Sequence, residues 1–250
     1  KIAFLVEGLI LRRYEARHCP RVATNVVVSD FDLRLLHDVA PTAHFAVVPN
    51  GVDTEYFYPM PPVGTRSLVF AGRLDQYSNR DAVLYFAHEI WPSIRQRFPD
   101  AVFDVLGSNP PAELRELASA DPALHVHGFV PDIRPYFEKA AIAVCPIRDG
   151  GGTRVKILDN LSMAKPIVST SIGTEGIDVV PARDLLIADD PSSFVDAISR
   201  LFTDGALRSC LSNNARSLAE QTYSWERIVR DQLNAYDDAT TYSRPGTPGR

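Results

Sequence analysis

Glycines, cations and a carboxylate gather in one short stretch of this 250-residue chain. Three consecutive glycines at 150–152 follow the apolar run 141–145 and precede a helix-like pattern. A glycine-rich turn lets a ligand approach the backbone closely, and a helix start offers free N–H groups to an anion. Arg154 and Lys156 add positive charge, and Asp159 can accept hydrogen bonds from sugar hydroxyls. This spacing predicts a site for a nucleotide diphosphate whose ribose reaches the carboxylate; the alternative is an ordinary turn between strand and helix.

The overall composition predicts a soluble globular protein. Hydrophobic residues make up 45% of the chain and charged residues 23%, as in ordinary globular domains. The net charge of −5 argues against nucleic acid as a partner. No apolar run approaches the roughly 20 residues that a membrane-spanning helix needs, so we expect no transmembrane segment. Cysteines that are odd in number and widely spaced favour reduced thiols in a cytoplasmic protein: Cys19, Cys145 and Cys210.

Strand-like and helix-like patterns alternate regularly from Ser67 onward. Short apolar runs predict buried strands at 68–71, 102–106, 124–127, 141–145, 167–170 and 185–187. Helical spacing predicts helices at 79–98, 191–202, 206–221 and 225–239. The helix after the three glycines should place on one face Val155, Leu158, Leu161 and Ser162. This alternation predicts an α/β fold with a doubly wound parallel sheet, in which ligands bind outside the carboxyl ends of the strands.

The first 48 residues contain too few strands for a sheet of usual size. A helix ends within 9–17, a buried strand is expected at 22–28, and Ser29 is a good N-cap for a helix at 32–38. A further strand is expected at 46–48, and the proline-rich segment 59–62 is typical of a linker. These elements are typical of the last part of an α/β domain.

Ordered motifs within residues 46–180 carry a resemblance to a known family. They are NGVD, FAGRLD, DVLGSNP, VHGFVPD, GGGTRVKILDNLSMAKPIVST and GTEGI. The segment resembles the donor-binding half of GT-B glycosyltransferases of family 4 (glycosyl transferases group 1). Residues 75–83 are similar to a subgroup of bacterial polysaccharide sugar transferases. The resemblance implies the C-terminal part of an incomplete N-terminal Rossmann-like domain (1–48), a donor-binding Rossmann-like domain (49–224) and a crossover helix (225–239). The last residues carry no apolar periodicity, which predicts a disordered tail (240–250).

The resemblance implies transfer of a sugar, of hexosyl type, from a nucleotide diphosphate sugar such as a UDP- or GDP-sugar to an acceptor. It further implies retention at the anomeric carbon, no metal or other cofactor, and a role in polysaccharide or glycoconjugate biosynthesis. A lipid-linked glycan acceptor, and with it a peripheral place at the inner membrane, stays open for this subgroup. Because the missing part of the N-terminal domain would supply acceptor contacts, we expect the chain alone to bind its donor weakly and to turn over little.

The resemblance also assigns roles to single residues. Arg73 matches the arginine that clamps the phosphates, although it could instead pair with Asp75 at the surface. Asp159 matches the second glutamate of the family's paired-glutamate signature, which holds the ribose, while the first falls at Gly151. The family's lysine after the GR motif is absent here, and Lys156 is the natural substitute, so Arg73 and Lys156 are the predicted catalytic residues. The other predicted donor-binding residues are Gly72, Asn79, Gly107, Phe129, Val130, Asp149, Gly150, Gly151, Gly152, Thr153 and Arg154.

Three other functions are alternatives to sugar transfer. A dinucleotide-dependent oxidoreductase should show GxGxxG after a strand, and none is present. A GT-B-fold nucleotide-sugar epimerase would place carboxylates and histidines in the cleft. We expect His125 and His127 to point one to the core and one to solvent, and we expect no metal site there. A non-catalytic nucleotide-sugar-binding or interaction module fits the loss of the first signature glutamate.

Overall fold

A computed structural model describes residues 2–60 and 63–241, which divide into two compact units. The first unit joins residues 1–51 to the segment from Trp225 onward, and the second runs from Val52 to Ser224. Pro61 and Pro62 of the expected linker lie outside the described residues. Met60 is buried, and its amide donates to the carbonyl of Met163 at 2.9 Å. The start of the proline-rich segment is therefore packed into the second unit and does not act as a free linker.

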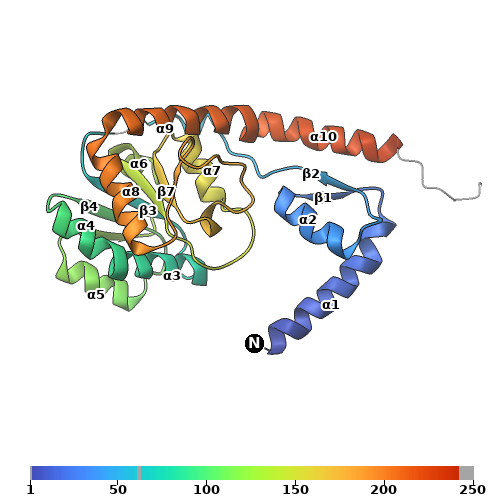
Figure 1. Cartoon of the computed structure of the whole chain (residues 1–250), viewed down its shortest axis with the longest axis horizontal. Helices are drawn as coiled ribbons and strands as arrows, with labels where there is room; N and C mark the ends of the chain where they lie inside the picture. Colours follow the sequence, from blue (N-terminus) through green and yellow to red (C-terminus); the bar gives the residue numbers. More distant parts are fainter. Residues whose placement is uncertain (1, 61–62, 242–250) are drawn as a thin grey trace, which may run out of the picture. The chain divides into compact units, whose positions relative to one another are not determined.

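The first unit contains a parallel pair of short strands and three helices among the described residues. Its elements are α1 (Ile2–His18), β1 (Asn25–Val27), α2 (Asp30–Val39), β2 (Phe45–Val47) and α10 (Trp225–Thr241), shown in Figure 1. Ser29 caps α2 as predicted, because its hydroxyl accepts the amide of Asp32 at 3.1 Å. Apolar contacts between Val48, Ile228 and Ala235 form a small core within this unit. Residues 240 and 241, expected in a disordered tail, continue α10, and residues 242–250 lie outside the described residues.

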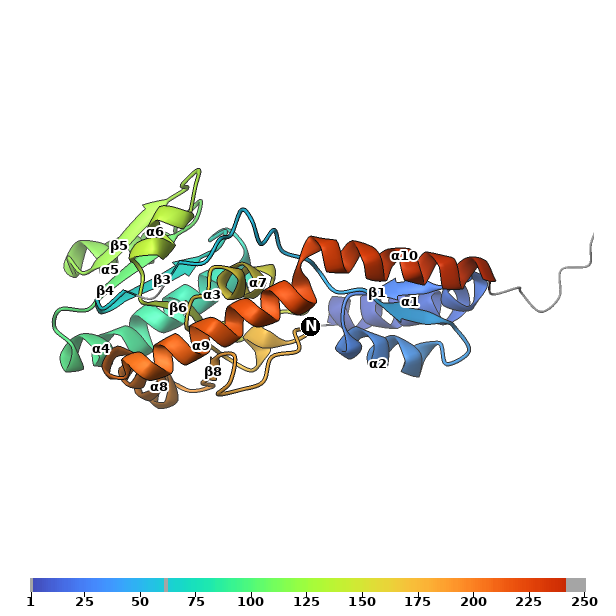
Figure 2. The ribbon, with the colours of Figure 1, turned by 90° about the horizontal axis from the view of Figure 1, so that it is seen from above.

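The second unit is organised around a six-stranded parallel sheet in the part of the chain that the structure describes. Its strands are β3 (Ser67–Ala71), β4 (Val102–Leu106), β5 (Leu124–Gly128), β6 (Ile142–Cys145), β7 (Ile167–Ser169) and β8 (Leu186–Ile187). They lie in the order β5-β4-β3-β6-β7-β8, which Figure 2 lets the reader follow from β5 to β6. Strands β4 and β5 are therefore added on one side of β3, and β6, β7 and β8 on the other, so the strand order reverses between β3 and β6. The predicted doubly wound α/β fold is confirmed.

Helices cover both faces of this sheet, as Figure 1 shows for α3–α5 on one face and α6 and α7 on the other. The helices are α3 (Tyr77–Tyr85), α4 (Trp91–Arg97), α5 (Ala112–Ala120), α6 (Arg134–Lys139), α7 (Val155–Ser162), α8 (Pro191–Thr203) and α9 (Gly205–Leu218). The helix predicted as continuous over 79–98 is interrupted by a π-helical turn at Phe86–Ile90. The turn precedes Pro92, which lacks an N–H and cannot extend an α-helix without such an adjustment. A second π-helical turn, Ala219–Tyr223, follows α9.

The core lies between the sheet and these helices. Leu158, Leu161 and Ser162 of α7 are buried as predicted, whereas Val155 is 45% exposed because it stands in the first turn at the open edge of the sheet. The three cysteines carry no disulfide, and burial raises the pKa of the Cys145 thiol. Among residues 2–60 and 63–241, no helix combines the length and apolar character needed to cross a bilayer.

Candidate functional site

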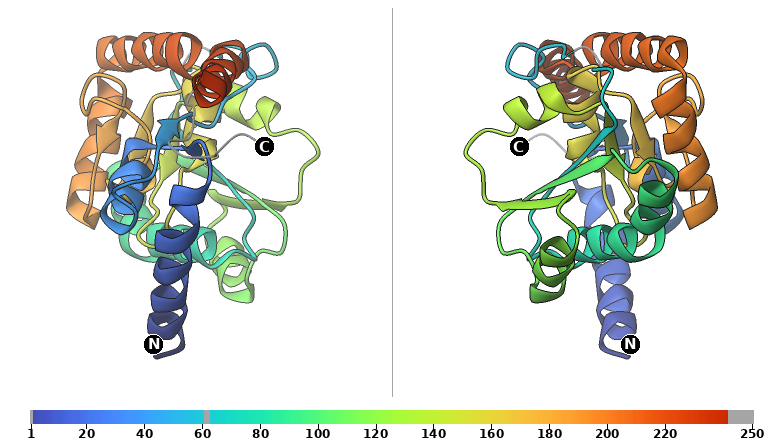
Figure 3. Two further views of the ribbon diagram at one scale, coloured as in Figure 1. Left: turned by 90° about the vertical axis from the view of Figure 1, so that its right-hand side faces the viewer. Right: turned by 90° about the vertical axis from the view of Figure 1, so that its left-hand side faces the viewer.

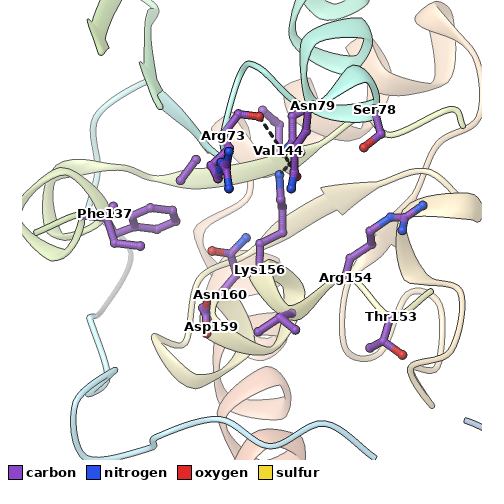
Figure 4. Close-up of a pocket in the computed structure, with 15 residues that line it drawn as sticks. Arg73, Ser78, Asn79, Phe137, Val144, Thr153, Arg154, Lys156, Asp159 and Asn160 are labelled. Carbon is purple, nitrogen blue, oxygen red and sulfur yellow. Dashed lines mark hydrogen bonds between the residues drawn. The ribbon is translucent and has the colours of Figure 1, made fainter. Parts of the chain in front are cut away.

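A pocket of about 460 Å³ opens where β3 and β6 end, against the first turns of α7 (Figure 4). Seven predicted site residues line it: Gly72, Arg73, Asn79, Thr153, Arg154, Lys156 and Asp159. Further lining residues, absent from the prediction, are Ala71, Gln76, Ser78, Ile133, Phe137, Val144, Val155 and Asn160. The site thus lies outside the carboxyl ends of the strands, next to the point where the strand order reverses.

Lys156 reaches across the pocket from α7 to the first turn of α3. Its ammonium donates to Asn79 Oδ1 at 2.6 Å and lies 4.3 Å from the centre of the Phe70 ring. Asn79 is held in turn, because its amide nitrogen donates to the carbonyl of Arg73 at 2.9 Å and to Gln76 Oε1 at 3.1 Å. Burial lowers the pKa of Lys156 below its ordinary value of 10.5. The ammonium is therefore desolvated and fixed in place, as a cation that binds an anion in the pocket would need to be.

Gly72 leaves the space that this ammonium occupies. A Cβ at Gly72 would lie 2.5 Å from Lys156 Nζ and 3.0 Å from Asn79 Oδ1. Gly107 is needed for a different reason, since its Cβ would lie 1.9 Å from the carbonyl oxygen of Gly72. Gly107 does not line the pocket, so the structure corrects its predicted role from ligand contact to close packing of two loops.

Arg73 lines the pocket and also forms an ion pair with Asp75 at the surface, so both interpretations of this residue hold. Its guanidinium, 67% exposed, donates to Asp75 through Nε at 3.2 Å and Nη2 at 2.7 Å. The hydrogen bond with Asp75 raises the pKa of Arg73 and lowers that of Asp75. A diphosphate bound by this fork would have to compete with the Asp75 carboxylate.

The glycine loop is folded around Arg154. The Arg154 guanidinium donates to the carbonyls of Gly150 at 2.6 Å, Gly151 at 2.5 Å and Gly152 at 2.8 Å. Gly150 and Gly152 have φ values of +107° and +83°, a region that favours glycine. The sequence predicts that Arg154 and these glycines face the ligand. Arg154 does line the pocket, but its terminal nitrogens donate to the loop, and the three glycines do not line the pocket.

Asp149 is committed to the same loop. Its carboxylate accepts the amide of Gly150 at 2.7 Å, and the residue does not line the pocket. The structure therefore gives Asp149 a role in shaping the turn, in place of the predicted contact with the donor.

Asp159 lies one turn along α7 from Lys156 and lines the pocket. Burial raises the pKa of its carboxyl group from 3.8 to about 7, and the charge of Lys156 partly opposes this rise. No hydrogen bond from a described residue offsets this rise in the pKa of Asp159. The carboxyl group is thus available to hydroxyl donors from a ligand.

Phe129 and Val130 follow β5 and do not line the pocket. Phe129 is 76% exposed, and Val130 packs against the core. The donor contact expected at these two residues would be made by their main chain, so it stays a prediction. Phe137 and Ile133 of the α6 region line the pocket instead; the apolar spacing of 133 and 137 was the sequence signal that would have found them.

His125 and His127 correct a further prediction. Both side chains lie on one face of β5, because alternate residues of a strand point the same way. Each ring contacts the same oxygen, Asp104 Oδ1 on the neighbouring strand, at 3.1 Å from His125 Nδ1 and 2.6 Å from His127 Nε2. Two imidazoles and a carboxylate thus gather where the sequence predicts no metal site, and they lie outside the pocket.

Comparisons with known proteins agree with this architecture. The family model described as glycosyl transferases group 1 matches residues 65–204. D-inositol 3-phosphate glycosyltransferase of Salinispora tropica is 27% identical over 90% of this chain and 52% of its own length. The chain thus spans about half the length of this curated relative.

Solved structures share the fold. A glycosyltransferase from Rickettsia africae superposes with a TM-score of 0.77 at 14% identity, covering 93% of this chain and 67% of that one. TarM from S. aureus, solved with UDP and α-GlcNAc-glycerol, gives 0.76 at 12% identity, covering 90% of this chain and 46% of that one. At such low identity these likenesses establish the fold alone.

Proposed function

Because the chain belongs to the glycosyl transferases group 1 family, we propose that its second unit binds the donor of a retaining, metal-independent glycosyltransferase. The donor would be a nucleotide diphosphate sugar. The observation that carries this proposal is the convergence of Lys156, Arg73 and Asp159 on one pocket at the carboxyl edge of the sheet. Two cations suit a diphosphate and a carboxyl group suits ribose hydroxyls. The UDP in the TarM structure supports the choice of ligand class.

Electrostatic stabilisation would supply most of the catalysis. The leaving diphosphate gains negative charge as its bond to the sugar breaks, and a cation already fixed in place stabilises that charge without reorganising. Lys156 meets this condition because Asn79 holds its ammonium in a desolvated position. Arg73 is exposed, and its guanidinium would exchange Asp75 for phosphate oxygens as the donor binds.

Gly151 is the main departure from the family's pattern. The side chain that the resemblance places there would contact the transferred sugar, and glycine removes it. A Cβ at Gly151 meets nothing within 4 Å, so the space beside the loop is open for a donor sugar. The similarity of residues 75–83 to polysaccharide sugar transferases supports a polysaccharide or glycoconjugate acceptor.

The test is isothermal titration calorimetry with UDP-, GDP- and ADP-sugars. Lys156→Met should weaken binding of the preferred nucleotide sugar by about 1.5–3 kcal/mol, as expected for a lost charged hydrogen bond. Lys139→Met removes the same charge from an exposed position of α6 outside the pocket and should leave the Kd unchanged. Equal affinities for the parent and Lys156→Met would reject the role of Lys156. Failure of the parent to bind any of the three sugars would favour a non-catalytic module.

A further inference from the structure

A second cluster of chemically active side chains lies on β4 and β5, apart from the residues that line the donor pocket. Asp104 stands beside His125 in the pairing of these strands. The register then shifts, so that Leu106 pairs with Gly128 and His127 becomes an extra residue. Such a bulge re-aims the side chain it carries. Here it lets His127 reach the same carboxylate oxygen as His125.

A hydrogen bond to the backbone fixes the tautomer of the His125 ring. His125 Nε2 lies 3.0 Å from the carbonyl oxygen of Pro122, which can only accept a hydrogen bond, so Nε2 carries the proton. In a neutral ring, Nδ1 then turns its lone pair toward Asp104 Oδ1, 3.1 Å away. Two acceptors face each other at this distance only if a proton or a metal ion lies between them. The contact is thus a place for a cation.

We propose that Asp104, His125 and His127 bind a divalent transition-metal ion of the zinc type. One ligand atom from each residue lies within 4.8 Å of the other two. Two imidazoles and one carboxylate suit Zn²⁺, with a fourth position open to water, whereas Mg²⁺ and Ca²⁺ prefer oxygen ligands. Ligand bonds of about 2.0–2.2 Å place tetrahedral ligand atoms roughly 3.4 Å apart. The two contacts with Asp104 Oδ1, now 3.1 and 2.6 Å, need to lengthen by less than about 1 Å to reach this spacing.

The surroundings hold the two rings in ligating orientation. A metal-bound histidine commonly donates its other ring N–H to a backbone carbonyl, which is the role of Pro122 toward His125. The His127 ring packs edge-on against Tyr136 of α6, with centroids 4.6 Å apart. Figure 3 shows the yellow-green loop that leads from β5 to α6 on this side of the sheet. The bound ion would tie the edge strand β5 to β4.

Titration of the whole chain with Zn²⁺ tests the proposal. After treatment with a chelator and its removal, calorimetry should show one strong Zn²⁺ site per chain, with a Kd of about 10 μM or below. His127→Ala and Asp104→Asn should each weaken this site by more than about 100-fold, since loss of a ligand should exceed the 10- to 100-fold effect of a residue behind the ligands. His88→Ala removes an imidazole that pairs with Glu113 elsewhere and should bind Zn²⁺ like the parent.

Two further measurements test whether these three residues are the ligands. Co²⁺ should give ligand-field bands without a thiolate charge-transfer band, because the free Cys210 thiol is not a ligand of this site. Zn²⁺ should raise the melting temperature of the parent and of His88→Ala, and have no effect on His127→Ala. If one ligand variant fails to fold, His125→Gln replaces it. The proposal would be overturned by parent-like Zn²⁺ affinity in a folded variant of Asp104, His125 or His127. A thiolate band with Co²⁺, or the absence of a Zn²⁺ site in the parent, would overturn it as well.

Discussion

Lys156 and Asp159 lie on the same side of α7 and share a desolvated wall of the pocket. Burial moves the pKa of the lysine down and that of the aspartate up, so each group is shifted toward its neutral form. Their mutual attraction opposes both shifts without cancelling them. Groups arranged this way are held at a cost to stability, which is common where a protein prepares a site for a ligand.

Replacing Asp159 by Asn should therefore stabilise the protein, with a distinct pH dependence. The folded-state pKa of about 7 lies above the unfolded value of 3.8. Well below pH 3.8 both states are protonated and the carboxyl group costs nothing. The cost grows as pH rises from about 4 to 7 and is complete above 7, where it corresponds to at most about 4 kcal/mol. Asp159→Asn should raise the melting temperature at pH 8 by much more than at pH 4.

Asp75→Asn is the matched control for this measurement. Its hydrogen bond with Arg73 lowers the pKa of Asp75, so its charged form is favoured in the folded state. Removing that charge should give no gain in melting temperature at any pH between 4 and 8. A gain of equal size at pH 4 and pH 8 for Asp159→Asn would contradict the assignment of the raised pKa to this carboxyl group.

At the scale of elements, the strands were predictable and their mutual register was not. β4 has its predicted bounds, and the other five strands of the large sheet differ by a residue or so, because buried parallel strands read as continuous apolar runs. The cation from Lys156 was found through its spacing from the glycines. The three hydrogen bonds from the Arg154 guanidinium depend on the positive φ values of Gly150 and Gly152. The contact of both histidines with Asp104 depends on a bulge between β4 and β5. The first leaves no pattern in the sequence, whereas the two-residue spacing of His125 and His127 does place both on one face of a strand.

Arg216 is an element-scale contact that the sequence did not reveal. It lies on α9 with a side chain 17% exposed, and its guanidinium joins α9 to the segment before β3 and to the end of α7. It donates to the carbonyls of Ser162 at 2.7 Å, Phe57 at 3.1 Å and Thr54 at 3.1 Å. One planar group thus satisfies acceptors from two separate segments of the second unit, which a single lysine ammonium could not span.

Arg216→Ala should lower the free energy of unfolding by about 2–4 kcal/mol, because three partly buried carbonyls lose a charged donor. Arg227→Ala in α10 is the control, since its pair with Asp231 is exposed and should contribute less than about 0.5 kcal/mol. Urea unfolding monitored by circular dichroism measures both. Equal midpoints for the two variants would mean that Arg216 does not hold these segments together.

At the scale of the whole molecule, the division between the units separates the pocket from the chain termini. Every residue that lines the pocket belongs to the second unit, as does the large apolar core. The two ends of this unit meet, because Val52 pairs with Ser224 and its amide donates to the carbonyl of Tyr223 at 2.8 Å. A segment whose ends are joined and whose core is its own has the properties of an independent domain.

Residues 52–224 alone should therefore fold and keep the donor site. We expect a cooperative thermal transition, since the sheet and the contacts of Arg216 all remain within the segment. Affinity for the preferred nucleotide sugar should stay within about threefold of that of the whole chain, a difference below 1 kcal/mol. Lys156→Met in the segment should weaken binding as much as it does in the whole chain, because the effect is local to the pocket. A segment that folds cooperatively yet loses most of its affinity would show that the first unit contributes to donor binding. A segment that does not fold would show that the core of the second unit is incomplete without α10 and residues 1–51.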